Sequence, residues 1–184
     1  MELLERVREH ARKVLVVSGT QGRTDLWLWE HSLRVSRLAE RIADLPEYAS
    51  QSPDRLAAVT AALFAGAGWA LQVAEGSVDR WQVLGRATSD VQRELAAATV
   101  QEELAALLPA ATVQRAVDAL RQCNDRYTDL VEAQIVSDAE NLADIGLAQV
   151  LRQFRQYQAE GRPLDVLFSK WQRQKEYRYW DARV

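Results

Sequence analysis

The chain has 184 residues, a formal net charge of −3 and one cysteine. The length suits one domain with a sizeable core, and the charge gives no basic excess for general binding to nucleic acid or to anionic membranes. The single cysteine, Cys123, excludes an intramolecular disulfide and a zinc site that needs several thiolates.

Two stretches bear on where the protein works. Residues 1–6 carry charges where a signal peptide needs an apolar core. The apolar run at 56–71 is mostly Ala and Gly and falls short of the ~20 strongly apolar residues that span a bilayer. We therefore expect a cytoplasmic protein without a membrane segment.

Glycine and proline are scarce, and apolar residues recur at helical spacing between them. This pattern predicts an all-α fold, a helical bundle in one domain over residues 1–184. The stretch over about 25–146 carries the motifs given below, and C-terminal helices follow over 147–184. Helices are expected at about 2–17, from 24 or 25 to 45, from 53 into the seventies, and at about 89–108, 110–124, 128–145, 147–159 and 164 onward.

The third predicted helix has no clear polar face before Gln72, which is typical of a central helix with others packed around it. It opens at residues 52–54, Ser-Pro-Asp, a sequence that favours a helix start. Gly66 and Gly68 each cost about 1 kcal/mol relative to Ala inside a helix. We expect close helix packing, or a bend where the helix ends early, to compensate for them.

Two polar residues lie where helical periodicity calls for an aliphatic one. His31 follows Leu28 and precedes Val35, and Asp138 lies between Ile135 and Leu142. A buried carboxylate needs a partner, which a histidine or a shared divalent metal could provide. The residues by themselves favour the simpler alternative, in which each is satisfied separately by local hydrogen bonds.

Three separated motifs, in order and at similar spacing, resemble those of the HD-domain phosphohydrolases. Residues 30–35, Glu-His-Ser-Leu-Arg-Val, resemble the opening histidine helix of that family. Residues 61–68, Ala-Ala-Leu-Phe-Ala-Gly-Ala-Gly, resemble the segment that carries the His-Asp pair. Residues 135–142, Ile-Val-Ser-Asp-Ala-Glu-Asn-Leu, resemble the closing aspartate motif. The resemblance implies an HD-like helical fold around a metal site.

The departures from the family pattern concern the metal site itself. Ala65 stands in place of the family's histidine, Gly66 in place of its aspartate, and Trp69 where a lysine is frequent. Of the metal-binding set implied by the resemblance, only His31 and Asp138 remain, as vestigial ligands. A hydrolytic centre needs about three protein ligands and an open position for water. The resemblance therefore implies a vacated pocket, no catalytic residues and no bound cofactor: a pseudoenzyme acting as a binding or regulatory module.

An alternative keeps the hydrolase. In it, substitute ligands complete a non-standard divalent-metal centre that acts on nucleotides or phosphate esters. The side chains that could supply them are Cys123, Asn124, Asp125 and Glu140, although none lies in a recognised metal spacing.

The C-terminal segment is basic and aromatic. Trp171, Tyr177, Arg178 and Trp180 could form a docking site for a partner. The pattern favours an amphipathic last helix instead, with Trp171 packed inward. We expect a protein partner or a small ligand rather than nucleic acid.

Overall fold

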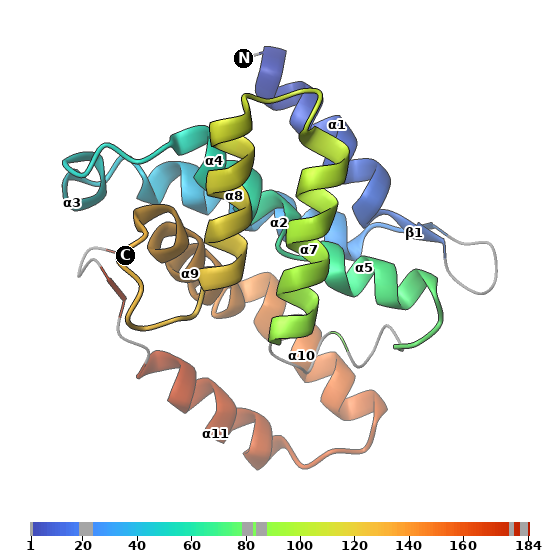
Figure 1. Ribbon diagram of the computed structural model, residues 1–184. Coiled ribbons are helices and arrows are strands. Elements are labelled where there is room, and N and C mark those ends of the chain that lie inside the picture. The colour runs from blue at the N-terminus through green and yellow to red at the C-terminus, as the bar shows by residue number, and fades with distance from the viewer. Residues whose placement is uncertain (1, 19–23, 79–82, 84–87, 177–178, 181–183) are drawn as a thin grey trace.

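The computed structural model describes residues 2–18, 24–78, 83, 88–176, 179–180 and 184, and within them the chain is all-α (Figure 1). This confirms the predicted fold class. The helices are α1 (Glu2–Leu15), α2 (Trp27–Ile42), α3 (Pro46–Ala49), α4 (Arg55–Phe64), α5 (Ala67–Ala74), α7 (Asp90–Leu104), α8 (Ala110–Gln122), α9 (Val131–Asp144), α10 (Leu147–Ala159) and α11 (Leu164–Lys175).

Two short elements were not predicted. Strands β1 (Val17–Ser18) and β2 (Thr24–Asp25) pair antiparallel between α1 and α2. Helix α3 is a single turn in a stretch that the sequence analysis left between helices. Both are too short to give a periodic pattern, so hydrophobic spacing could not reveal them.

Helix α4 is the centre of the bundle, as the sequence predicted. All of its residues from Ala57 to Phe64 are buried, and α1, α2, α7, α8 and α9 pack around it. Its start is held by the Asp54 side chain, which accepts hydrogen bonds from Ala57 N at 3.0 Å and from Thr112 Oγ1 at 2.9 Å. The second bond joins the α4 start to α8.

The predicted third helix is interrupted, and its two glycines have different roles. Helix α4 ends at Phe64 and α5 begins at Ala67, so Gly66 lies in the break. A Cβ on Gly66 would lie 3.0 Å from Ser32 Oγ on α2, whereas a Cβ on Gly68 would lie 2.2 Å from the backbone oxygen of Gln92 on α7. The early helix end and the close helix packing expected from the sequence therefore both occur.

Residues 55–74 also pass the length and composition test for a membrane span. In the fold, 72% of their most apolar window is buried among the other helices. A buried core helix gives the same signal as a membrane helix, so this stretch is explained by its position in the bundle.

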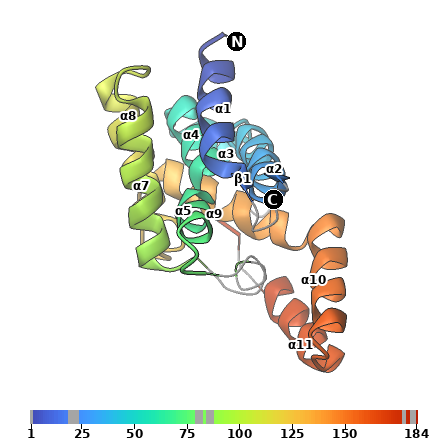
Figure 2. The ribbon, with the colours of Figure 1, turned by 90° about the vertical axis from the view of Figure 1, so that its right-hand side faces the viewer.

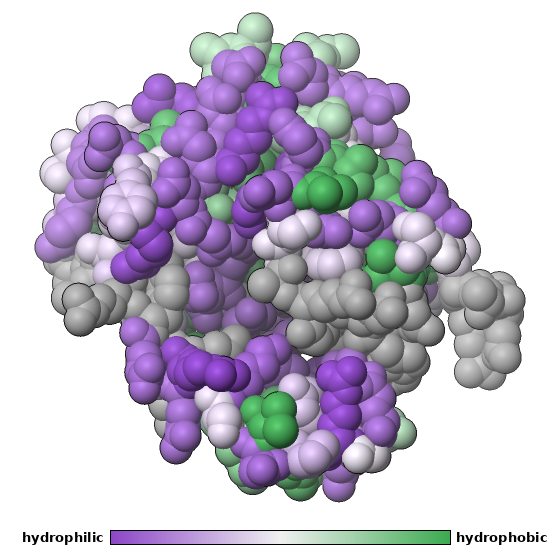
Figure 3. Space-filling model, turned by 60° about the horizontal axis from the view of Figure 1, so that its bottom comes forward, coloured by the Kyte–Doolittle hydropathy of each residue, from purple (hydrophilic) through white to green (hydrophobic). Residues whose placement is uncertain are grey.

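Helices α10 and α11 form a hairpin that extends from the body of the bundle (Figures 1 and 2). Within it, Leu167 is fully buried and Trp171 Nε1 donates a 2.7 Å hydrogen bond to Gln153 Oε1. Seen from this end, the surface is mostly hydrophilic, with hydrophobic side chains in separate patches (Figure 3). The hairpin is thus a small helical unit with its own contacts, and it adds a wall to the site described next.

Candidate functional site

A cavity of about 680 Å³ lies between the bundle and the α10–α11 hairpin. Helix α2, the break between α4 and α5, and α9 supply walls on the bundle side, and Gln149, Gln153, Lys170 and Arg173 supply the wall on the hairpin side. The cavity is therefore made by segments that lie far apart in the sequence.

The residues expected around a vacated pocket border this one cavity. His31 reaches it from α2, Ala65 and Gly66 from the break, and Trp69 from the first turns of α5. Ala65 and Gly66 bring no polar side chain to the cavity, and His31 lines the same space.

Asp138 is not among the residues that line the cavity. Its carboxylate is fully buried on another face of α9, where it accepts a 2.7 Å hydrogen bond from the Tyr48 hydroxyl and one of 3.0 Å from Trp180 N. His31 Nδ1, in contrast, is buried without a hydrogen-bond partner among the described residues. The partners of Asp138 thus come from α3 and the C-terminal segment, and they are neither His31 nor the local groups that the sequence analysis favoured.

The His31 ring is neutral at physiological pH. It stacks on Trp27, one turn earlier on α2, with ring centroids 5.8 Å apart and 25° between the planes. Burial, together with the positive charges of Arg34 and Arg152, lowers the pKa of His31 to about 4. A neutral imidazole retains a nitrogen lone pair, so it can accept a hydrogen bond or bind a metal.

Two carboxyl groups face the cavity from successive turns of α9. Burial raises the pKa of Glu140 to about 7, with a contribution from the negative charge of Asp144, while a hydrogen bond from Asn124 opposes the shift. Burial likewise raises the pKa of Asp144 to about 6, against the attraction of Lys170. Residues four apart on a helix lie on one face, so this wall carries closely spaced negative charge when both groups ionise.

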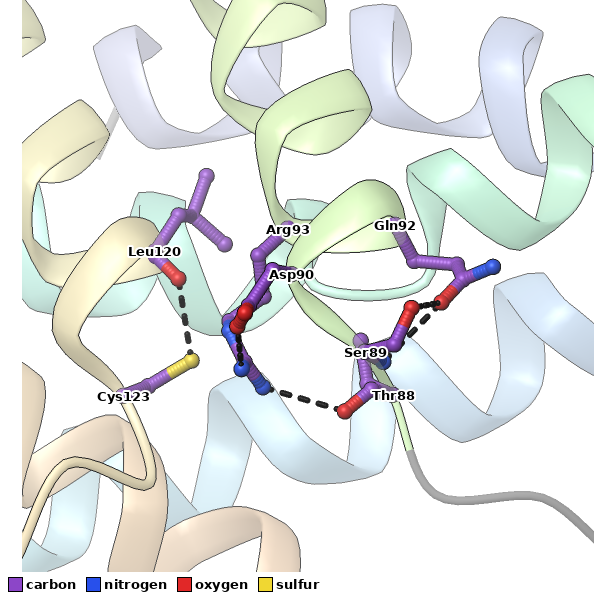
Figure 4. Close-up of polar contacts among 7 residues, drawn as sticks. All are labelled: Thr88, Ser89, Asp90, Gln92, Arg93, Leu120 and Cys123. Atoms are coloured by element: carbon purple, nitrogen blue, oxygen red, sulfur yellow. Dashed lines mark hydrogen bonds and ion pairs between the residues drawn. The ribbon is translucent and has the colours of Figure 1, made fainter.

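Cationic side chains border the cavity as well. Arg93 is held at the start of α7, where it donates a 3.0 Å hydrogen bond to Thr88 O and forms an ion pair with Asp90 (Figure 4). Burial lowers the pKa of Lys170, and the nearby Asp144 carboxylate opposes that shift. Arg173 lies exposed on the last turns of α11.

Three of the four proposed substitute ligands are neighbours, because Asn124 hydrogen bonds to Glu140 and Cys123 lies near Glu140. Asn124 and Glu140 line the cavity, whereas Cys123 is buried beside it with Sγ 3.1 Å from Leu120 O (Figure 4). Burial raises the pKa of the Cys123 thiol, which disfavours the thiolate that binds metals. Asp125 accepts a hydrogen bond from Tyr127 N. Within the described part of the chain, no three His, Cys, Asp or Glu side chains come close enough to share a metal.

Trp171 and Trp180 of the C-terminal segment make contacts with other residues of the protein. Trp171 bonds to Gln153, and the Arg126 guanidinium lies 5.2 Å from the centroid of the Trp180 ring. Tyr177 and Arg178, the other two residues of the expected docking site, lie outside the described residues. Trp171 therefore packs inward, as the amphipathic-helix interpretation predicts, while Trp180 contacts the protein from beyond the end of α11.

Sequence reasoning missed several residues of the cavity, among them Asp144, Lys170 and Gln149. One signal was available: Glu140 and Asp144 are like charges four residues apart on α9, a spacing that slightly destabilises a helix. Lys170 and Gln149 gave no such signal, because only the fold of the hairpin brings them to α9.

Comparison of the chain with models of known protein families, with curated proteins and with solved structures found no match.

Proposed function

We propose that this protein is a non-catalytic, HD-like module that binds a small molecule in the cavity between the bundle and the α10–α11 hairpin. The observation that carries the proposal is the cavity itself: four residues singled out by the resemblance, His31, Ala65, Gly66 and Trp69, border it together. Its volume of about 680 Å³ falls in the usual range for small-molecule sites.

The proposal excludes hydrolysis by the standard HD centre for a chemical reason. Ala65 and Gly66 offer no side-chain ligand, and Asp138 already accepts hydrogen bonds from Tyr48 and Trp180. His31 would be left as the one member of the expected ligand set that faces the cavity. A single histidine holds a catalytic metal too weakly to sustain turnover.

Ligand-observed NMR with a mixture of small polar and aromatic fragments tests the proposal. Fragments that bind the wild-type protein should lose their signal in Ala65→Leu, which places a larger side chain at the cavity wall. Ala105→Leu is the matched control, because Ala105 is exposed at the end of α7 and does not line the cavity. Fragment binding that survives Ala65→Leu would contradict a site in this cavity.

An assay for metal-dependent hydrolysis tests the alternative enzyme. Clean protein dialysed against manganese, iron, nickel or zinc is expected to leave p-nitrophenyl phosphate and nucleoside phosphates intact. Turnover that requires one of these metals and disappears in His31→Ala would overturn the non-catalytic proposal. It would instead support the alternative hypothesis, a phosphohydrolase with a non-standard metal centre.

A further inference from the structure

Resting on the proposed binding function, we infer that the ligand is a small organic cation, a protonated amine on an apolar or aromatic body. Its ammonium group would lie against Glu140 and Asp144 of α9, and its body against the apolar wall formed by α2 and the start of α5. The inference depends on which hydrogen-bonding groups the cavity leaves unused.

The unused groups on α9 and α10 are mainly acceptors. Glu140 and Asp144 both line the cavity, and the neutral Asn124 amide is the hydrogen-bond partner that Glu140 has there. The Asn141 amide donates one N–H to Ser137 O at 2.8 Å, which leaves its oxygen and its second N–H for a ligand. Gln149 is only 5% exposed, and its Oε1 has no hydrogen-bond partner among the described residues. A ligand with several N–H donors would satisfy such a wall.

The protein's own cations at the cavity are already engaged or peripheral. Both Nη atoms of Arg93 are bonded at the α7 start, one to Thr88 O and one to Asp90 (Figure 4). Lys170 faces Asp144 and offsets a single negative charge. Arg173 is exposed. With Lys170 set against Asp144, the cation near Glu140 is Arg93, whose two Nη atoms are paired elsewhere and whose Nε has no hydrogen-bond partner among the described residues.

The apolar part of the lining suits an apolar or aromatic body. It includes Leu28, Val35, Ala65 and Trp69, and Trp69 is 6% exposed. The protein uses the same kind of contact next to the cavity, where the Arg152 guanidinium lies 4.5 Å from the centroid of the Trp27 ring. Indole rings bind cations more strongly than other aromatic side chains do.

The same arrangement disfavours an anionic ligand such as a phosphate ester. Arg93, Lys170 and Arg173 also line the cavity. Because Arg93 is paired with Asp90 and Lys170 faces Asp144, an anion would have to approach the two α9 carboxylates with Arg173 as the remaining exposed cation. Like charges brought together in a partly buried site repel strongly because solvent screens them poorly. The negative charge on α9 therefore makes this cavity a poor site for a phosphate group.

Three probes of one shape and different charge test the inference: benzylamine, benzyl alcohol and benzoate. Their binding to the full chain at pH 8 is measured by ligand-observed NMR titration and by isothermal calorimetry. Benzylamine is expected to bind at least about tenfold more tightly than benzyl alcohol, since hydrogen bonds to charged groups contribute about that much. Benzoate is expected not to bind.

Charge-neutralising variants assign the effect to α9. Glu140→Gln and Asp144→Asn should each weaken benzylamine binding about tenfold and leave benzyl alcohol unchanged. Glu102→Gln is the control, because Glu102 is exposed on α7 and does not line the cavity. Thermal melting shows whether each variant folds. If only one of the two α9 variants folds, that variant alone is enough for the test.

The outcomes distinguish failure of the cationic-ligand inference from failure of the proposed binding function. Benzoate binding more tightly than benzylamine, with loss of binding in Ala65→Leu, would overturn the cationic ligand and leave the cavity as a binding site. Equal binding of all three probes, or benzylamine binding that both α9 variants retain, would also overturn it. Absence of any binding, by these probes and by the fragment mixture, would contradict the proposed function as well.

Discussion

The Tyr48 hydroxyl donates a 2.7 Å hydrogen bond to the Asp138 carboxylate, and both side chains are buried. The contact joins the single turn of α3 to the middle of α9, 90 residues later in the chain. Trp180 N donates to the same carboxylate, which ties the C-terminal segment to α9. A buried charge is thus placed where three separate segments meet, and it stabilises the fold only while its donors are present.

Removing the Tyr48 hydroxyl should therefore destabilise the protein. Tyr48→Phe is expected to lower the free energy of unfolding by about 2 kcal/mol, the usual contribution of a hydrogen bond to a charged group. Urea denaturation followed by far-UV circular dichroism measures the change. Tyr127→Phe is the control, because Tyr127 is 92% exposed. Equal stability of the two variants would mean that the Tyr48–Asp138 bond contributes nothing.

The separation of His31 from Asp138 predicts that substitutions at the two residues act independently. In a double-mutant cycle of His31→Ala and Asp138→Asn, the two changes in unfolding free energy should add to within about 0.5 kcal/mol. The same cycle built on Tyr48→Phe and Asp138→Asn should show a larger coupling. A strong coupling between His31 and Asp138 would instead support a direct interaction between them, one of the alternatives drawn from the sequence.

The close approach of α5 to α7 makes Gly68 sensitive to any side chain. A Cβ at this position would lie 2.2 Å from the Gln92 backbone oxygen, so the helices must separate to admit it. Gly68→Ala is expected to destabilise the protein by about 1–3 kcal/mol despite the better helix propensity of Ala. The comparison is Gly66→Ala, whose Cβ would meet the Ser32 hydroxyl at 3.0 Å, a group that can rotate away. If the two variants unfold at the same urea concentration, the result would contradict the close contact between α5 and α7 at Gly68.

The raised pKa of Asp144 predicts a pH-dependent stability difference. Its pKa is about 6 in the folded protein and about 4 in an unfolded chain. Between these values the folded state holds the proton and the unfolded state does not, so stability falls as pH rises through this window. Asp144→Asn removes the titration and should gain stability relative to wild type between pH 4 and pH 7, with no further change above. Urea denaturation of both proteins at pH 4.5 and pH 7.5 measures this stability difference. The same difference at both pH values would contradict the raised pKa of Asp144.

Hydrophobic spacing alone predicted most helices to within a few residues. Helix α10 has the predicted bounds, and α7, α8 and α9 end one to four residues inside theirs. The break between α4 and α5 was one of two alternatives attached to Gly66, because a glycine in an apolar run indicates either a bend or a close contact. The sequence could not place Asp138, since periodicity shows that a residue is buried but not what it meets.

The sequence by itself determined the all-α class, the burial of α4 and the isolation of a few polar residues on apolar helix faces. These follow from local propensity and from the 3.6-residue period, which any window of the chain contains. Only the tertiary structure decided that His31, Glu140, Asp144 and Lys170 line one cavity. That arrangement depends on where the α10–α11 hairpin packs, and packing between distant helices is set by the shapes of both surfaces together.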